Sequence, residues 1–137
     1  MIFRSTYQRI TIIHSRKPTE LNIHQKLQWL ANSLGLFNLR DKENSCFRLF
    51  IELLKASKKN ESLSSDELAM RLNLTRGTVV HHLKKLIEAG IVISEQNKYY
   101  LRVDNLKDLV TEIEKDMTRT LESLKKTASE IDDQLGL

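Results

Sequence analysis

The chain has 137 residues, of which 40% are hydrophobic and 29% charged, and its formal net charge is +4. This length predicts one domain with an appended element, and the scarcity of Gly (4) and Pro (1) favours a mostly helical fold over a turn-rich all-β sandwich. The single cysteine, Cys46, excludes an internal disulfide framework and fits a reducing, cytoplasmic location. No apolar run approaches the roughly 18 residues of a membrane span, so we expect no membrane-spanning helix.

The charge is distributed unevenly along the chain. Residues 1–103 hold 17 Lys and Arg against 9 Asp and Glu, whereas residues 104–137 hold 5 against 9. The first 18 residues contain four of these bases and no acid. This asymmetry predicts that the basic residues 1–103 face nucleic acid and that the acidic residues 104–137 face a different partner. The alternative for the acidic part is a solvent-exposed helix with surplus acids.

The first third of the chain predicts an arm and two helices. Residues 1–18 form the basic arm, and residues 9–14 within it could make a short strand before Pro18 ends any regular element. A helix is expected from about Leu21 to Leu34, because apolar residues recur there at steps of three and four, and Gly35 suits its left-handed end. A second helix is expected to begin near Asp41 as its N-cap residue. Its inward side chains would be Cys46, Phe47, Phe50, Ile51 and Leu54.

The signals are sharper after residue 63. Ser64 and Glu67 fit a capping box at the start of a short helix over residues 65–72. Thr75 can cap the next helix, and Gly90 is expected to end it. Runs of β-branched and aromatic residues at 91–93 and 99–103 flank a polar tip at 95–98, which predicts a hairpin. A last helix, capped by Asp104, is expected to reach about residue 135.

Two short helices about three residues apart and followed by a hairpin describe a winged helix-turn-helix. The predicted fold class is therefore mostly α, with some β: a winged helix-turn-helix with a two-stranded wing and a long C-terminal dimerisation helix. The predicted division of the chain is an arm at 1–18, a DNA-binding domain at 19–103 and the long helix at 104–137.

The second helix of such a pair enters the major groove of DNA, and its residue types suit that task. With Val79, Leu83 and Leu86 facing the core, the helix presents Arg76, which can donate two hydrogen bonds to a guanine. The alternative is that this face is merely solvated, or that it binds a protein. DNA contacts are predicted on this helix, on the wing, and at the residue that caps the helix over residues 65–72. They are Ser64, Thr75, Arg76, Gly77, Thr78, Val80, His81, Lys84, Lys85, Lys98 and Arg102.

Residues 63–103 resemble the winged helix-turn-helix transcription regulators, especially the ArsR-like class found in archaea. The resemblance lies in LSSDELAMRLNLTRGTVVHHLKKLIEAGIV and in KYYLR. It implies DNA binding, usually as a homodimer on a palindromic site, with the flanking helices as the dimer interface. Metal-sensing members carry cysteines near the recognition region, or His and Asp ligands on the final helix. Residues 104–137 contain neither His nor Cys, so we expect no metal site.

The adjacent histidines His81 and His82 do not change this expectation. Neighbouring residues on a helix point about 100° apart, so the two rings are poorly placed to share one ion. We expect His82 to be half-buried and bonded to the backbone, and His81 to contact DNA.

The last helix carries a long apolar seam that predicts a homodimer. At 1.5 Å per residue its roughly 32 residues span about 48 Å, whereas the winged domain is only some 25–30 Å across. One domain cannot cover the whole seam, and the simplest partner is the same helix in a second subunit. The alternative is that the helix folds back onto the first helix of its own chain. The seam residues are Leu106, Leu109, Ile113, Met117, Leu121, Leu124, Ala128, Ile131 and Leu135.

The sequence thus predicts a sequence-specific, homodimeric regulator that binds double-stranded DNA. The alternative is a winged-helix protein-interaction module within a larger transcription or replication assembly. No nucleophile motif, phosphate loop or cofactor fingerprint occurs, so we expect neither an enzyme nor a bound cofactor. The target sequence, the sign of regulation and any small-molecule effector stay open.

Overall fold

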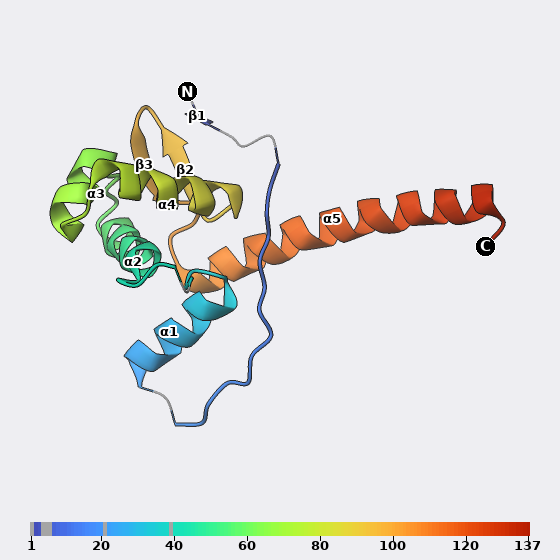
Figure 1. Ribbon diagram of the computed structural model, residues 1–137, viewed down its shortest axis with the longest axis horizontal. Helices are drawn as coiled ribbons and strands as arrows, with labels where there is room; N and C mark the ends of the chain where they lie inside the picture. The colour runs from blue at the N-terminus through green and yellow to red at the C-terminus, as the bar shows by residue number, and fades with distance from the viewer. Residues whose placement is uncertain (1, 4–6, 21, 39) are drawn as a thin grey trace.

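The computed structural model describes residues 2–3, 7–20, 22–38 and 40–137. It confirms the predicted fold class, which is mostly helical with a hairpin after the two short helices and a long C-terminal helix (Figure 1). Arg4 of the basic arm and Leu21, the expected start of the first helix, lie outside the described residues. In chain order the elements are β1 (Ile2–Phe3), α1 (Ile23–Ser33), α2 (Ser45–Lys58), α3 (Ser65–Leu72), α4 (Arg76–Glu88), β2 (Val92–Glu95), β3 (Lys98–Leu101) and α5 (Leu106–Leu135).

The helix ends follow from local side-chain chemistry. The capping box at α3 is confirmed: the Ser64 hydroxyl accepts from the Glu67 amide at 3.1 Å, and the Glu67 carboxylate accepts from the Ser64 amide at 3.4 Å. Gly35 and Gly90 adopt the left-handed conformation predicted for them, with φ of 77° and 79°. In each case the next amide reaches back to the helix, as in a Schellman end, and so satisfies carbonyls that have no intrahelical partner.

Two of the predicted caps are wrong. The N-cap residue of α2 is Asn44, and Asp41 acts from further upstream: its two carboxylate oxygens accept from the amides of Ser45 and Cys46, each at 2.9 Å. A carboxylate on a turn before the helix can thus satisfy the same free amides as an N-cap side chain. The N-cap residue of α5 is Asn105 rather than Asp104, and its side chain accepts from the Asp108 amide at 2.8 Å.

The core lies among α2, α3, α4 and the hairpin. Phe50 and Leu49 of α2, Leu68 of α3 and Val79 and Leu83 of α4 are fully buried there. Phe50, Leu68, Val79 and Leu83 were predicted to face inward. Leu49 was not, whereas Ile51 and Leu54, which were predicted inward, are only half-buried. Cys46 is buried in the same core, and burial raises the pKa of its thiol to about 11. The packing holds α4 against the body by one face and leaves its opposite face outward.

The wing is tighter than predicted and has a third strand beside it. Strands β2 and β3 pair antiparallel with Val92 opposite Leu101, and only Gln96 and Asn97 form the tip, both with positive φ. Two residues in that conformation match the twist of the flanking strands. The short strand β1 pairs antiparallel with the outer edge of β2, which the predicted two-stranded wing did not include.

The arm at residues 7–20 is extended but forms no strand, so the strand considered for residues 9–14 is wrong. Its backbone instead bonds to helix ends: the Arg9 amide donates to the carbonyl of Glu88, and the Ile13 amide to that of Ser33, each at 2.8 Å. Carbonyls in the last turn of a helix have no intrahelical donor, and the arm supplies two. It therefore runs across the body from the end of α4 past α5 to α1 (Figure 1).

Helix α5 is divided into a packed and a projecting part. Leu109 and Ile113 are buried against their own chain, so assigning them to a dimer seam is wrong, and Leu106 packs beside them. From Met117 onward every residue is exposed, and the helix extends well beyond the body (Figure 1). The alternative, in which this helix folds back onto α1, does not hold for the projecting part. The domain boundaries at 18/19 and 103/104 stay a prediction.

Candidate nucleic-acid interface

The outward face of α4 carries the densest group of predicted DNA contacts. Val79, His82, Leu83 and Leu86 are the buried residues of this helix. Thr78 and Val80 are half-buried beside them. The residues that point fully outward are Arg76, Gly77, His81, Lys84 and Lys85. Among the described residues of α4, the only acid is Glu88 in its last turn, where the Tyr7 hydroxyl lies 3.2 Å from the carboxylate.

The first turn of α4 leaves room for a close approach by a ligand. Thr75 caps the helix, because its hydroxyl oxygen accepts from the Thr78 amide at 3.1 Å. The same hydroxyl lies 2.8 Å from the Thr78 hydroxyl, so both side chains are partly engaged. A Cβ built on Gly77 would meet no atom within 4 Å, so this glycine has open space outside it. Free amides at a helix N-terminus favour a phosphate.

Two of the basic residues predicted to contact DNA have acidic neighbours on α3. Arg76 Nε lies 3.6 Å from Asp66, and Lys98 Nζ lies 2.9 Å from Glu67 on α3. The bond from Lys98, together with the Ser64 amide, holds the pKa of Glu67 below its usual value. Exposed pairs of this kind contribute little, so a phosphate or a base can displace the carboxylate at small cost.

Ser64 and Arg102 have other roles in the structure. The Ser64 hydroxyl serves the capping box of α3 and is half-buried. Arg102 points toward α5, where it makes a two-pronged ion pair with Asp116, its Nη1 and Nη2 lying 2.5 and 3.2 Å from the two carboxylate oxygens. The structure therefore corrects the assignment of Arg102 to the DNA backbone. This residue joins the base of the wing to α5. The sequence pattern held no signal for this pairing, because Asp116 lies 14 residues away on another element.

A groove runs beside the outward face of α4, with a volume of about 410 Å³. His82 forms part of it with only 8% of its side chain exposed, and its Nε2 lies 3.9 Å from Asp41. Its Nδ1 is buried without a hydrogen-bond partner among the described residues, so the expected bond to the backbone is wrong. Burial lowers the pKa of His82, which keeps the ring neutral near pH 7. The residues that line the groove are Asn38, Arg40, Asp41, Thr78, His81, His82 and Lys85.

The rings of the adjacent His81 and His82 lie at an angle to one another. Their ring centroids are 5.5 Å apart, and the ring planes are tilted by 60°. In the part of the chain that the structure describes, no group of three or more His, Cys, Asp and Glu is placed to hold a metal ion.

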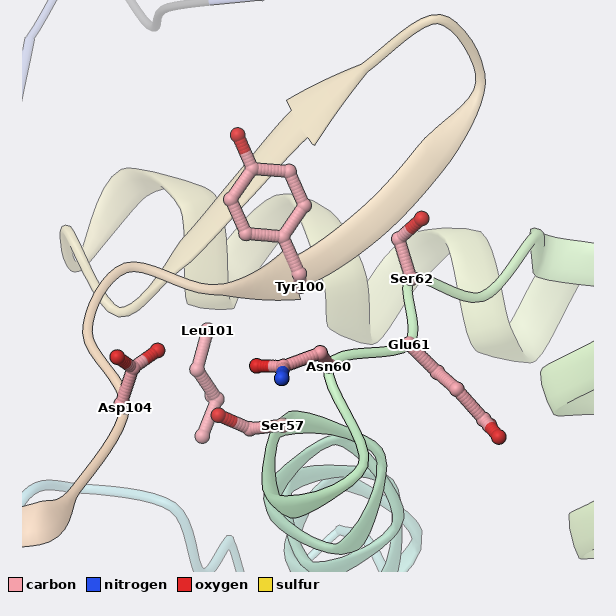
Figure 2. A pocket seen from close by; sticks show the side chains of 7 residues that line it. All are labelled: Ser57, Asn60, Glu61, Ser62, Tyr100, Leu101 and Asp104. Atoms are coloured by element: carbon pink, nitrogen blue, oxygen red, sulfur yellow. The ribbon is translucent and has the colours of Figure 1, made fainter.

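A second, smaller hollow of about 250 Å³ lies between the end of α2 and β3 (Figure 2). Ser57, Asn60 and Leu101 point into it, whereas the Glu61 carboxylate points away and the Tyr100 ring rises along the hairpin. The Tyr100 hydroxyl donates to Glu95 at 2.8 Å. Asp104 closes one side. Among the described residues, no basic side chain lines this hollow, so it does not suit a phosphate, and none of its lining residues lies on α4.

Residues 48–101 match a family model described as the HTH domain. The match runs from α2 to the end of β3 and covers both short helices and the wing, but fewer than half of the residues of the chain. It supports a helix-turn-helix regulator that binds DNA. The ArsR-like class and an archaeal origin stay predictions from the resemblance.

No curated protein and no solved structure matched the chain. Over its described residues, no helix is both long and apolar enough to cross a membrane.

Proposed function

We propose that the protein is a sequence-specific transcription regulator that binds double-stranded DNA as a homodimer. The observation that carries the proposal is the outward face of α4, where Arg76, His81, Lys84 and Lys85 are exposed together above a firmly packed inner face. A helix of this kind fits the major groove, which is about 12 Å wide. In this proposal residues 75–89 enter the groove, Arg76 reads a base, and Lys84, Lys85 and Lys98 contact phosphates.

The proposed dimer rests on the projecting half of α5. Its exposed apolar residues recur at steps of four and three along one stripe, which is the repeat of a two-stranded coiled coil. The arm lies beside the first turns of this stripe, where a groove is lined by Ile10, Ile12, Met117 and Leu121. The described residues from Met117 onward are all exposed. The residues proposed for the seam are Met117, Leu121, Leu124, Ala128, Ile131 and Leu135. Two wings held by such a stalk would meet half-sites about one DNA turn, 34–36 Å, apart.

Replacing Arg76 by Ala should relax base preference. Loss of one side chain that donates two hydrogen bonds to a base costs about 1–3 kcal/mol of discrimination. We therefore expect binding to the preferred duplex to weaken by about 5- to 150-fold, while binding to random DNA changes little. Selection from a random duplex library identifies the preferred site, and fluorescence anisotropy then measures both affinities.

Lys126→Ala is the control, because it removes the same charge from an exposed position on α5. The second half of this helix projects away from α4 (Figure 1). It should leave both affinities unchanged. If the wild-type protein prefers no duplex over random DNA at moderate salt, the proposal fails. A stable complex with a different protein and no DNA would instead favour the protein-interaction module.

A further inference from the structure

The groove beside α4 is lined by residues from two separate parts of the chain, and each part supplies a basic side chain, Lys85 from one and Arg40 from the other. Thr78, His81 and Lys85 lie on α4, whereas Asn38, Arg40 and Asp41 lie on the loop that precedes α2. This loop is outside residues 48–101, the segment that matches the HTH domain. Only the tertiary structure therefore brings Arg40 to the face that is proposed to meet DNA.

The one carboxylate in the groove is already engaged. Both oxygens of Asp41 accept hydrogen bonds from the amides at the start of α2. Burial pushes the pKa of Asp41 up, but these bonds from Cys46 and Ser45 hold it below its usual value. Neither Arg40 nor Lys85 forms an ion pair with another described residue, although both are exposed. The groove therefore presents two positive charges that form no ion pair with a described residue, beside an ionised carboxylate that is turned to the amides of α2.

One residue that lines the groove has a buried polar atom without a hydrogen-bond partner among the described residues. Buried polar atoms in native proteins are nearly always hydrogen-bonded, so one without a partner marks a place where a water or a ligand belongs. His82, a lining residue whose side chain is more than nine-tenths buried, has such an atom in Nδ1. Thr78 and His81 add a hydroxyl and a second imidazole nearby. Two cations with hydrogen-bonding side chains beside them suit an anion with several oxygens, and the Asp41 carboxylate is held by the amides at the start of α2.

We propose that this groove holds a backbone phosphate of the bound DNA, with Arg40 and Lys85 on either side of it. Arg40 is then a DNA contact supplied by the loop before α2. This inference rests on the proposed function, because Thr78, His81 and Lys85 are also on the face of α4 that is to enter the major groove. The contact positions the helix on the duplex and carries no base preference.

The salt dependence of binding tests the inference. Each phosphate contact contributes about 0.9 to the slope of log K against log salt concentration. For Arg40→Ala we expect the slope to become shallower by about 1, and the affinity at moderate salt to fall by about 5- to 10-fold for preferred and random duplexes alike. The double variant Arg40→Ala/Lys85→Ala should lose less than the sum of the two single losses, because both residues contact one phosphate.

Lys42→Ala is the matched control. It removes the same charge from the same loop, and Lys42 is exposed but does not line the groove. Its slope should equal that of the wild type. Equal losses for Lys42→Ala and Arg40→Ala would overturn the inference, because general charge would then account for both. If the wild type binds DNA and Arg40→Ala binds with an unchanged slope, the groove site is wrong while the proposed function stands. If the wild type binds no duplex, the proposed function itself fails.

Discussion

Arg102→Ala is expected to lower the free energy of unfolding by about 3 kcal/mol, because it leaves the Asp116 carboxylate buried without its main partner. Asp116 is only 5% exposed, and it is the point where three segments meet. Arg102 at the base of the wing holds both of its oxygens, and Gln8 of the arm donates to one of them at 2.8 Å. Removing one partner of a buried charge costs more than the pair itself contributes. Urea unfolding followed by circular dichroism measures the loss.

The pH dependence of stability should change in the same variant. Burial pushes the pKa of Asp116 up, but its bonds to Arg102 and Gln8 dominate and hold it at about 2, below the ordinary 3.8. A carboxyl with a lowered pKa contributes stability that is full above about pH 4 and is lost as the pH falls toward 2. Without Arg102 the pKa of Asp116 rises. We therefore expect acid unfolding of Arg102→Ala to begin at a higher pH than that of the wild type.

Arg119→Ala is the control for this prediction. Arg119 contacts the same carboxylate at 2.5 Å, but its side chain is 70% exposed, whereas that of Arg102 is 24% exposed. Exposed ion pairs contribute about 0–1 kcal/mol, so Arg119→Ala should change stability little. Equal losses for the two variants would contradict the role given to burial. A variant of Arg102 that loses DNA affinity but no stability would restore that residue to the DNA interface.

Leu124→Asp is expected to convert a dimer into a monomer. Leu124 lies in the middle of the exposed stripe on α5 and is 59% exposed within its own chain. In the proposed dimer it is buried against the partner helix, and losing a buried Leu costs about 2–5 kcal/mol even before the cost of a buried carboxylate. The dimer should therefore weaken by at least about 100-fold. Light scattering gives the molar mass, and anisotropy on a palindromic duplex shows whether binding to both half-sites is lost.

Ser123→Asp provides the matched control, because it adds the same charge one residue away. Neighbouring helical residues point about 100° apart, so Ser123 lies off the stripe. This variant should remain a dimer. Neither substitution should lower the melting temperature of the winged domain, since both residues are exposed. A wild-type monomer, or a Leu124→Asp dimer, would show that the stripe serves another purpose.

Local patterns predicted the helix-turn-helix with good accuracy. The residues from the capping box at Ser64 to the Schellman end at Gly90 form the elements that the sequence predicts, because the caps and turns there depend on neighbours within a few positions. The same local reasoning gave the wrong N-cap residue for two helices, Asp41 for α2 and Asp104 for α5. Each is a good capping residue, but an asparagine nearer the helix took the N-cap position, and only the surrounding chain path decides which residue occupies it.

The sequence alone determined that a basic outward face lies on α4 and that an apolar stripe runs along α5, since helical spacing assigns residues to faces whatever the helix packs against. It did not determine which part of the stripe the chain covers itself, nor that Arg102 turns from the wing to Asp116. It also held no sign that Arg40 lies beside Lys85. These are contacts between segments far apart in the chain, and their partners are chosen by how the arm, the wing and α5 pack together. The spacing of apolar residues assigns a residue to a face of its helix but does not say which distant segment packs against that face. Only the tertiary structure shows these contacts.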